Sequence, residues 1–229
     1  MGEWIAFWDS EHAIYVNARH RDVHYRIIAE HIRRYVPAGG SVLDYGCGEA
    51  LHAELPAETA SQLILCEAAP KVRATLTTRF TGNAKIQVMS PEQVATLPNQ
   101  SLDLIVMHSV AQYLTAQELD DLLILFHRLL KSECHLVLGD IIPPRVSAFT
   151  DAIALLRLAK REGFFIAACL GLVRTVMSSY WSLRSTLGLT RYDRDEMLGK
   201  LTKAGFWATT AHMNIGHNQA RITYLARPA

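Results

Sequence analysis

Several features that mark particular protein classes are absent from this sequence. No apolar run reaches the roughly 18 residues that a membrane-spanning helix needs, and the longest, GFFIAACLGLV at 163–173, is shorter. The formal net charge is only +1, which gives no electrostatic reason to expect a nucleic-acid partner. The N-terminal stretch MGEWIAFWDSEH lacks a basic region followed by an apolar run, so it is not typical of a signal peptide.

Cysteine is also scarce. The four cysteines, at 47, 66, 134 and 169, form no CxxC pair, and three of them lie in or beside apolar runs. Reduced, buried thiols are the simplest interpretation of that pattern. We therefore expect a reducing compartment and a cytoplasmic protein, with no metal site built on cysteine.

What is present is an alternation of strand and helix patterns in a chain of 229 residues, a length that fits a single domain over 1–229. Capping signals mark two of the helix starts, SPEQ at 90–93 and TAQE at 115–118. The expected strands are 42–45, 62–67, 85–89, 102–107 and 134–140. The expected helices are 11–35, 49–55, 70–82, one from 90 and one over 115–130.

The alternation stops after residue 140. Residues 143–190 carry two or three apolar helical segments, and a helix follows from Asp193 to a stop at Gly205. Two strands, 207–214 and 219–228, have no helix between them and must pair antiparallel. We predict an α/β fold: a mostly parallel seven-stranded sheet with helices on both faces, an antiparallel C-terminal hairpin, an N-terminal helical cap (1–36) and a helical lid insertion (143–190).

The stretch SVLDYGCGEA at 41–50 carries the main functional signal. Gly46 and Gly48 follow a buried strand and let the backbone pass close to a ligand at the carboxyl end of the sheet. Asp44 would repel a pyrophosphate but suits a ligand with a cationic amino-acid end. Glu67 ends the next strand, where a carboxylate can accept both hydroxyls of a ribose.

These motifs resemble those of class I S-adenosylmethionine (SAM) dependent methyltransferases. VLDYGCGEA is similar to the first motif of that family, LILCEAAP to the second, and SLDLIVMHSVAQYL to its fourth strand and following loop. LTKAGF and the terminal hairpin resemble its last helix and strands. Ala50 departs from the pattern, since a third glycine is usual there. The resemblance implies methyl transfer from SAM to a small molecule, leaving S-adenosylhomocysteine (SAH).

The resemblance also implies a set of binding residues. Glu92 and Gln93 lie where the family often contacts adenine, although the helix cap alone explains Gln93. The first helix of the family often closes over SAM, which makes Tyr15, Asn17 and Arg19 candidates. The expected cofactor-binding residues are Asp44, Gly46, Cys47, Gly48, Glu67, Glu92, Gln93, His108 and Tyr15.

Three residues are candidates for the acceptor side of the site. His108 ends the fourth strand and is either a pocket-wall histidine or a general base for a hydroxyl or amine. Tyr113 either packs or contacts substrate, and Asp140 either caps the next segment or faces substrate. His20 and His24 share a helix face, but no third metal ligand is indicated, so we expect both to be exposed to solvent.

The acceptor and the partners stay open at this level. Methyl transfer needs no fixed catalytic dyad, so the residues do not identify the accepting atom. The segment 163–181 is apolar with basic and aromatic flanks, which fits a lid packed on the sheet, a pocket or membrane surface for a lipophilic acceptor, or a dimer contact. The chain is a monomer or a homodimer. The rival functions are a non-catalytic SAM-binding protein and a nicotinamide-dependent oxidoreductase, although Leu51 stands where the latter needs glycine.

Overall fold

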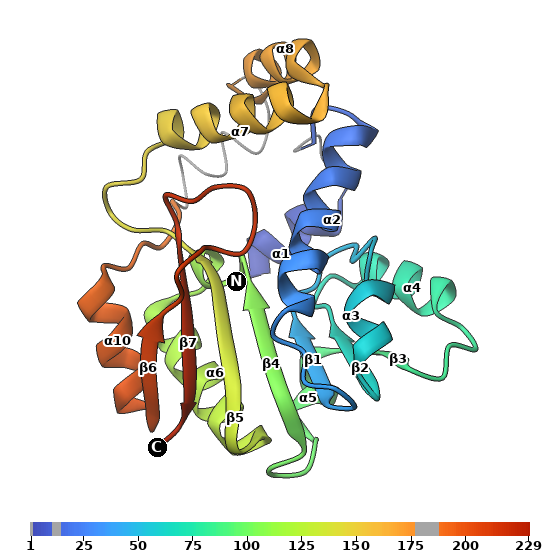
Figure 1. The fold of residues 1–229 in the computed structure, drawn as a ribbon, viewed down its shortest axis with the longest axis vertical. Helices are drawn as coiled ribbons and strands as arrows, with labels where there is room; N and C mark the ends of the chain where they lie inside the picture. The colour runs from blue at the N-terminus through green and yellow to red at the C-terminus, as the bar shows by residue number, and fades with distance from the viewer. Residues whose placement is uncertain (1, 11–14, 177–187) are drawn as a thin grey trace.

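The computed structural model describes residues 2–10, 15–176 and 188–229, and its centre is a seven-stranded sheet in the order β3-β2-β1-β4-β5-β7-β6 (Figure 1). Strand β7 pairs antiparallel with both β5 and β6, whereas β1 to β5 pair in parallel. The predicted sheet is confirmed. The strands are β1 (Ser41–Tyr45), β2 (Gln62–Cys66), β3 (Ile86–Met89), β4 (Leu102–His108), β5 (Leu130–Ile141), β6 (Phe206–Thr210) and β7 (Ile222–Pro228).

Helices cover both faces of the sheet because alternate strand residues point to opposite sides. Leu43 and Ile105 pack with α5 (Pro91–Ala95), α6 (Ala116–Leu129) and α10 (Arg194–Lys203) on one face. Val42 and Leu104 pack with α2 (Ala18–Arg33), α3 (Glu54–Thr59) and α4 (Pro70–Arg79) on the other. The sheet is therefore buried on both sides, and only its edges and strand ends are open to a ligand.

The predicted helix caps form. Ser90 with Gln93, and Thr115 with Glu118, make reciprocal capping boxes at α5 and α6. Asp193 accepts a hydrogen bond from the backbone of Glu196 at the start of α10. These local signals were sufficient because a cap depends on side chains only three positions apart.

The N-terminal region differs from expectation. A short helix, α1 (Gly2–Trp8), precedes α2, and α2 begins at Ala18 instead of residue 11 because Asn17 caps it. The helix expected over 49–55 lies later in the chain, as α3, and contains Pro56 in its first turn. Proline is tolerated there because that backbone position has no helical hydrogen bond to lose.

The C-terminal strands are shorter than predicted, and β5 is longer. Strand β6 stops at Thr210 and β7 starts at Ile222, so an irregular loop over 211–221 replaces the expected short connection. Strand β5 starts at Leu130 instead of residue 134. The loop contains Asn214, Gly216 and Asn218, residue types that favour turns over strands.

Two helices, α7 (Ala148–Glu162) and α8 (Phe165–Val176), fill the described part of the insertion between β5 and α10 and lie above the strands' upper ends in Figure 1. Tyr180, Trp181 and the rest of 177–187 lie outside the described residues. Phe164, between the two helices, is buried against His20, whereas Phe165 is exposed.

No helix in the described ranges is both long and apolar enough to cross a membrane. All four cysteines are free. Cys47 and Cys66 are buried, Cys134 is partly buried, and Cys169 is exposed.

One close helix contact should be sensitive to added volume. A Cβ at Gly171 in α8 would lie 2.1 Å from the Cγ1 atom of Val16. We expect Gly171→Ala to lower the free energy of unfolding by about 1–3 kcal/mol through overpacking, and Val16→Ala to restore part of it. Gly199→Ala in α10, where no atom lies within 4 Å of the added Cβ, should stabilise the protein by up to about 1 kcal/mol. Urea unfolding of the variants checks both, and equal effects at the two glycines would contradict the packing account.

Candidate functional site

A cavity of about 1370 Å³ lies beyond the carboxyl ends of β1, β2, β4 and β5. Residues of α1, α2 and α7 also line it. It includes the point between β1 and β4 where the strand order reverses, the usual ligand site of open α/β sheets. Its volume exceeds the roughly 300–1,000 Å³ typical of a single small-ligand site, so it has room for a second small molecule.

The glycine turn after β1 forms one wall of this cavity. The backbone N–H groups of Gly46 and Cys47 both donate to the carbonyl of Cys66, at 2.8 and 3.1 Å. Gly46 and Gly48 have φ of +78° and +58°, where side chains are disfavoured. A Cβ at Gly46 would also lie 2.3 Å from Val110. The turn therefore requires glycine at both positions.

Ala50, two residues further on, adopts the same left-handed conformation with φ of +42°. An alanine in this region is strained by about 1–2 kcal/mol. Arg79 donates to the carbonyls of Glu49 and Ala50, at 2.9 and 2.5 Å, and so fixes the strained segment from α4. Alanine therefore stands, in a left-handed conformation held by Arg79, at the position where a third glycine is usual in the motif.

Glu67 joins the glycine turn to the turn after β2. Its Oε2 accepts from the backbone N–H of Gly48 at 2.9 Å, and its Oε1 accepts from that of Ala69 at 2.8 Å. Arg73 donates to the carbonyl of Glu67 at 2.7 Å. Burial raises the pKa of Glu67, although the two backbone bonds oppose that shift. Each carboxylate oxygen keeps a further lone pair that could accept a hydroxyl.

Asp44 also lines this cavity. Within the described residues its carboxylate has no hydrogen bond and no ion pair. Burial, with the nearby charge of Glu67, raises the pKa of Asp44 to about 7. An uncompensated carboxylate in a cavity fits a cationic ligand group, which would supply the missing partner.

The other predicted cofactor residues divide into two groups. Cys47, Tyr15 and Glu92 line the cavity, Glu92 at its exposed rim. Gln93 does not line it, because its side-chain oxygen accepts from the backbone N–H of Ser90 in the helix cap. The helix cap therefore accounts for Gln93, and its adenine contact stays a prediction.

Asn17 and Arg19, the other two candidates for contacts with SAM, differ in where their side chains lie. Asn17 caps α2 and lines the cavity. Arg19 points elsewhere, donating to the backbone carbonyl of Glu162 in α7.

His108 is buried at the end of β4 and lines the cavity. Its Nε2 lies 3.2 Å from the carbonyl of Ile215, so Nε2 carries the proton and Nδ1 is left with a lone pair. Burial lowers the pKa of His108, which keeps the ring neutral near pH 7. A neutral imidazole of this kind can accept a proton.

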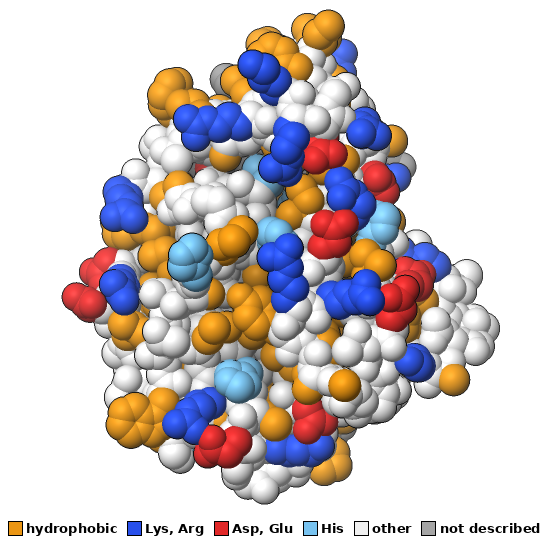
Figure 2. All heavy atoms as spheres, viewed as in Figure 1, with side chains coloured by type: hydrophobic (Ala, Val, Ile, Leu, Met, Phe, Trp, Pro, Cys, Tyr) orange, Lys and Arg blue, Asp and Glu red, His pale blue; other side chains and the backbone are white. Residues whose placement is uncertain are grey.

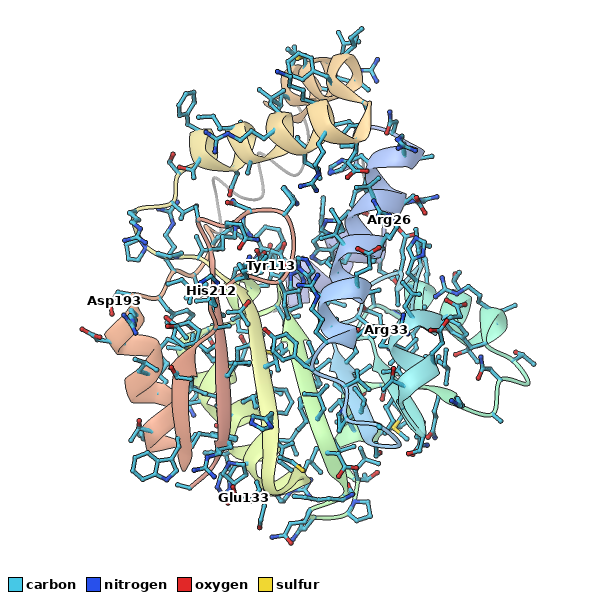
Figure 3. All side chains as sticks on the ribbon, viewed as in Figure 1. Arg26, Arg33, Tyr113, Glu133, Asp193 and His212 are labelled. Atoms are coloured by element: carbon cyan, nitrogen blue, oxygen red, sulfur yellow. The ribbon has the colours of Figure 1, made fainter. Side chains whose placement is uncertain are left out.

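Tyr113 packs against the N-terminal helix as well as lining the cavity. Its ring centroid lies 4.6 Å from that of Trp4 and 5.8 Å from that of Trp8. Figure 3 shows Tyr113 above the carboxyl ends of the central strands. It therefore connects α1 to the cavity wall.

Asp140, at the end of β5, anchors a buried charge network. Its Oδ2 accepts from Ser109 Oγ and from Arg221 Nη1, both at 2.5 Å. Arg221 also donates to Asp151 of α7 at 3.0 Å, and Asn218 donates to the same oxygen. Burial acts to raise the pKa of Asp140, but Arg221 and its other neighbours hold it below its usual value. The network ties α7 and the 211–221 loop to the sheet.

The expectation that His20 and His24 are exposed is wrong. His20 is buried, stacked on Phe164 at 5.2 Å, and its Nδ1 accepts from the backbone of Val16. Burial lowers the pKa of His20 to about 4 and lowers that of His24 as well. The ring centroid of His24 lies 6.4 Å from that of His217 in the 211–221 loop. Among the described residues no three side chains form a metal-binding group.

Part of the cavity lining was not predicted from the sequence. Gln112, His217 and Arg221 line the cavity, and two of their buried polar atoms, Gln112 Oε1 and Arg221 Nε, find no partner within the described chain. Buried polar atoms normally have partners, so these two are candidate ligand contacts. The turn-forming residues Asn214, Gly216 and Asn218 could have revealed the loop that carries His217.

Comparison with known families agrees with this geometry. Residues 43–138 match the family model described as a methyltransferase domain. Among proteins with curated descriptions, none matches this sequence significantly.

Solved structures with the same fold include two methyltransferases. The magnesium protoporphyrin IX methyltransferase of Synechocystis PCC 6803 with bound SAH is 14% identical with a TM-score of 0.57, and the match covers 100% of this chain and 94% of that one. A SAM-dependent methyltransferase of Mesorhizobium loti is 16% identical with a TM-score of 0.55, and the match covers 87% of this chain and 95% of that one. The family match covers the segment with the glycine turn, Glu67 and His108, and the structural matches extend the likeness in fold to nearly the whole chain. Together they favour a SAM-dependent methyltransferase.

Asp44 should destabilise the ligand-free protein. Burial, with the nearby charge of Glu67, raises the pKa of Asp44 from its ordinary value of 3.8 to about 7 in the folded state. Between these two pH values the folded state binds more protons than the unfolded state, so stability falls as pH rises. We expect Asp44→Asn to raise the free energy of unfolding at pH 8 by about 1–3 kcal/mol, with the gain shrinking toward pH 4. Urea unfolding at several pH values measures it.

Asp103 is the matched control. It accepts from Lys131 Nζ at 2.8 Å and from the backbone of Ser41 at 2.9 Å. Although burial opposes it, Lys131 lowers the pKa of Asp103. Asp103→Asn should therefore destabilise the protein at pH 8. If both variants changed stability in the same direction, the assignment of Asp44 as an unpartnered carboxylate would be wrong.

Proposed function

We propose that this protein transfers a methyl group from SAM to a lipophilic small molecule, with SAM held by Asp44, the Gly46–Gly48 turn and Glu67. The observation that carries this proposal is the unpartnered carboxylate of Asp44 beside a glycine turn that Glu67 fixes. A cationic amino-acid end and a ribose are the groups that these two carboxylates suit.

In this proposal each side chain has a separate task. Glu67 accepts the ribose hydroxyls with its remaining lone pairs, and Asp44 pairs with the ammonium group. Cys47 lies between the two glycines, where its backbone borders the cofactor. Glu92 borders the adenine at the cavity rim. Tyr15, near the start of α2, belongs to a cap over 1–36 that covers the bound cofactor.

When bound, SAM supplies a methyl group attached to a cationic sulfur, and loss of that methyl group turns the sulfur into a neutral thioether. The protein's main task is then to hold the acceptor atom in line with that methyl group, which can supply roughly 7–11 kcal/mol in favourable cases. We assign to His108 Nδ1 the removal of a proton from an acceptor hydroxyl or amine where one is present.

The acceptor side combines apolar and polar walls. Trp4, Tyr113 and Leu155 supply apolar surface, and Gln112 Oε1 and Arg221 Nε supply unpartnered polar atoms. Asp140 fixes Arg221 and so shapes the acceptor subsite. This mixture suits a largely apolar molecule with one or two polar groups. The insertion over 143–190 acts as its lid.

The apolar character of the insertion supports a lipid-soluble acceptor. We include in the proposal a lipid contact through 163–181, of which 177–181 lie outside the described residues. The exposed apolar side chains of α8 support it.

Two other functions make different predictions. A nicotinamide-dependent oxidoreductase would bind NADH, and a non-catalytic protein of this fold would bind SAM without turnover. Isothermal titration with SAM, SAH and NADH distinguishes the proposed methyltransferase from an oxidoreductase. Measuring SAH formation with a panel of apolar and polar acceptors distinguishes it from a non-catalytic SAM-binding protein. We expect micromolar binding of SAM and SAH, no binding of NADH, and turnover of apolar acceptors. NADH binding without SAM binding would overturn the proposal.

Glu67→Ala should weaken SAM binding by about 1.5–3 kcal/mol, the usual worth of charge-assisted hydrogen bonds. Glu58 is a suitable control because it makes only an exposed ion pair with Arg33 on the protein surface. Glu58→Ala should leave SAM affinity unchanged in the same titration. An unchanged affinity in folded Glu67→Ala would remove Glu67 from the site.

A further inference from the structure

Helix α8 is apolar on every side but docks on the protein through one side only. Over Phe165–Val176 its only charged residue is Arg174. Phe164, Ala168 and Gly171, spaced four and three apart, are buried. Phe164 stacks on His20, and Gly171 allows close contact with Val16. This inner face fixes the orientation of the helix.

The opposite side of α8 is exposed. Ile166 is 77% exposed, Val173 66%, Leu170 58% and Phe165 46%. We call these four residues the α8 outer face. A helix that is apolar all round is normally buried, and adjoining exposed apolar side chains usually mark an interaction surface. At 12 residues α8 is too short to span a bilayer but long enough to lie in its interface.

Unpaired cations flank the outer face. Arg157 and Lys160 of α7 and Arg174 of α8 are exposed, and none makes an ion pair with the described residues. Figure 2 shows basic and hydrophobic side chains together over α7 and α8 at the top of the molecule.

The two acids of α7 are already paired with cations, and α8 has no acid. Asp151 is paired with Arg221, and Glu162 is paired with Arg26 and Arg161. The charge left for a partner is therefore positive, which complements an anionic surface.

We propose that the α8 outer face, flanked by Arg157, Lys160 and Arg174, docks this protein on an anionic lipid bilayer. The helix lies in the plane of the interface, its apolar side chains among the acyl chains and the cations at the head groups. This docking deepens the proposed function, on which it rests for the link to the acceptor. Helix α7, which carries Arg157 and Lys160, also lines the cavity through Asp151 and Leu155.

The test is co-sedimentation of the full chain with vesicles. Phosphatidylcholine vesicles containing phosphatidylserine should bind the protein, whereas phosphatidylcholine alone should bind it much more weakly. Each cation removed, in Arg157→Gln, Lys160→Gln and Arg174→Gln, should weaken binding to the anionic vesicles about 5-fold. Added salt should weaken it further.

The apolar part is tested with Ile166→Gln/Leu170→Gln, both at exposed positions that contribute little to folding. We expect at least about a 10-fold loss of vesicle binding, with an unchanged melting temperature and unchanged SAM affinity. Trp207→Gln is the matched control, because Trp207 is 68% exposed on β6, at the sheet edge away from α8. It should bind vesicles like the wild type.

A second measurement uses Cys169, which is exposed on α8. With Cys134→Ser in place, an environment-sensitive dye on Cys169 should shift to shorter wavelength with anionic vesicles.

Three results would overturn the proposal: no binding of wild type to anionic vesicles, equal binding by Ile166→Gln/Leu170→Gln, or a solution dimer that this double variant converts to monomer. SAM binding by the wild type is measured in a separate titration. A wild type that binds anionic vesicles but not SAM would contradict only the proposed function.

Discussion

The bridge that the Glu67 carboxylate makes between two turns holds the site together. One oxygen binds the backbone of Gly48 after β1, and the other binds the backbone of Ala69 after β2. Neither turn is regular secondary structure, so each needs a side chain to satisfy its buried N–H groups. Because β1 and β2 pair in parallel, their ends meet at one edge, and a single carboxylate can reach both. This bridge therefore fixes the positions of the two turns relative to each other.

The same arrangement places two buried carboxyl groups close together, which is electrostatically unfavourable until a cationic ligand binds. Asp44 and Glu67 are two carboxyl groups in one cavity, and burial with their mutual repulsion raises the pKa of Asp44 to about 7. A cationic ligand removes this penalty, so binding energy and folding energy are linked at this site. Around Asp140, by contrast, Arg221 already neutralises the carboxylate, which leaves that part of the cavity suited to a mainly uncharged molecule.

The sequence predicted features that depend on neighbouring residues. Strand positions, capping boxes and the turn at Gly46 and Gly48 follow from local spacing. The order of these elements along the chain was enough to predict a mostly parallel sheet with an antiparallel C-terminal hairpin. The sequence did not predict contacts between distant segments. His20 is buried because Phe164, between α7 and α8, stacks on it, and His217 reaches the cavity because residues 211–221 leave the sheet. The spacing of Trp4, Phe7 and Trp8 is compatible with a helix, but the contact of Trp4 with Tyr113, which helps to place α1, joins segments that are far apart in the sequence.

A crystal structure of the protein with SAH tests the central claim most directly. We expect the ribose hydroxyls within hydrogen-bond distance of Glu67 and the ammonium group beside Asp44. The sulfur should lie within about 8 Å of His108, the reach of one substrate atom and a bridging water. SAH bound elsewhere in the cavity, with Glu67 still making only its two backbone bonds, would contradict the account.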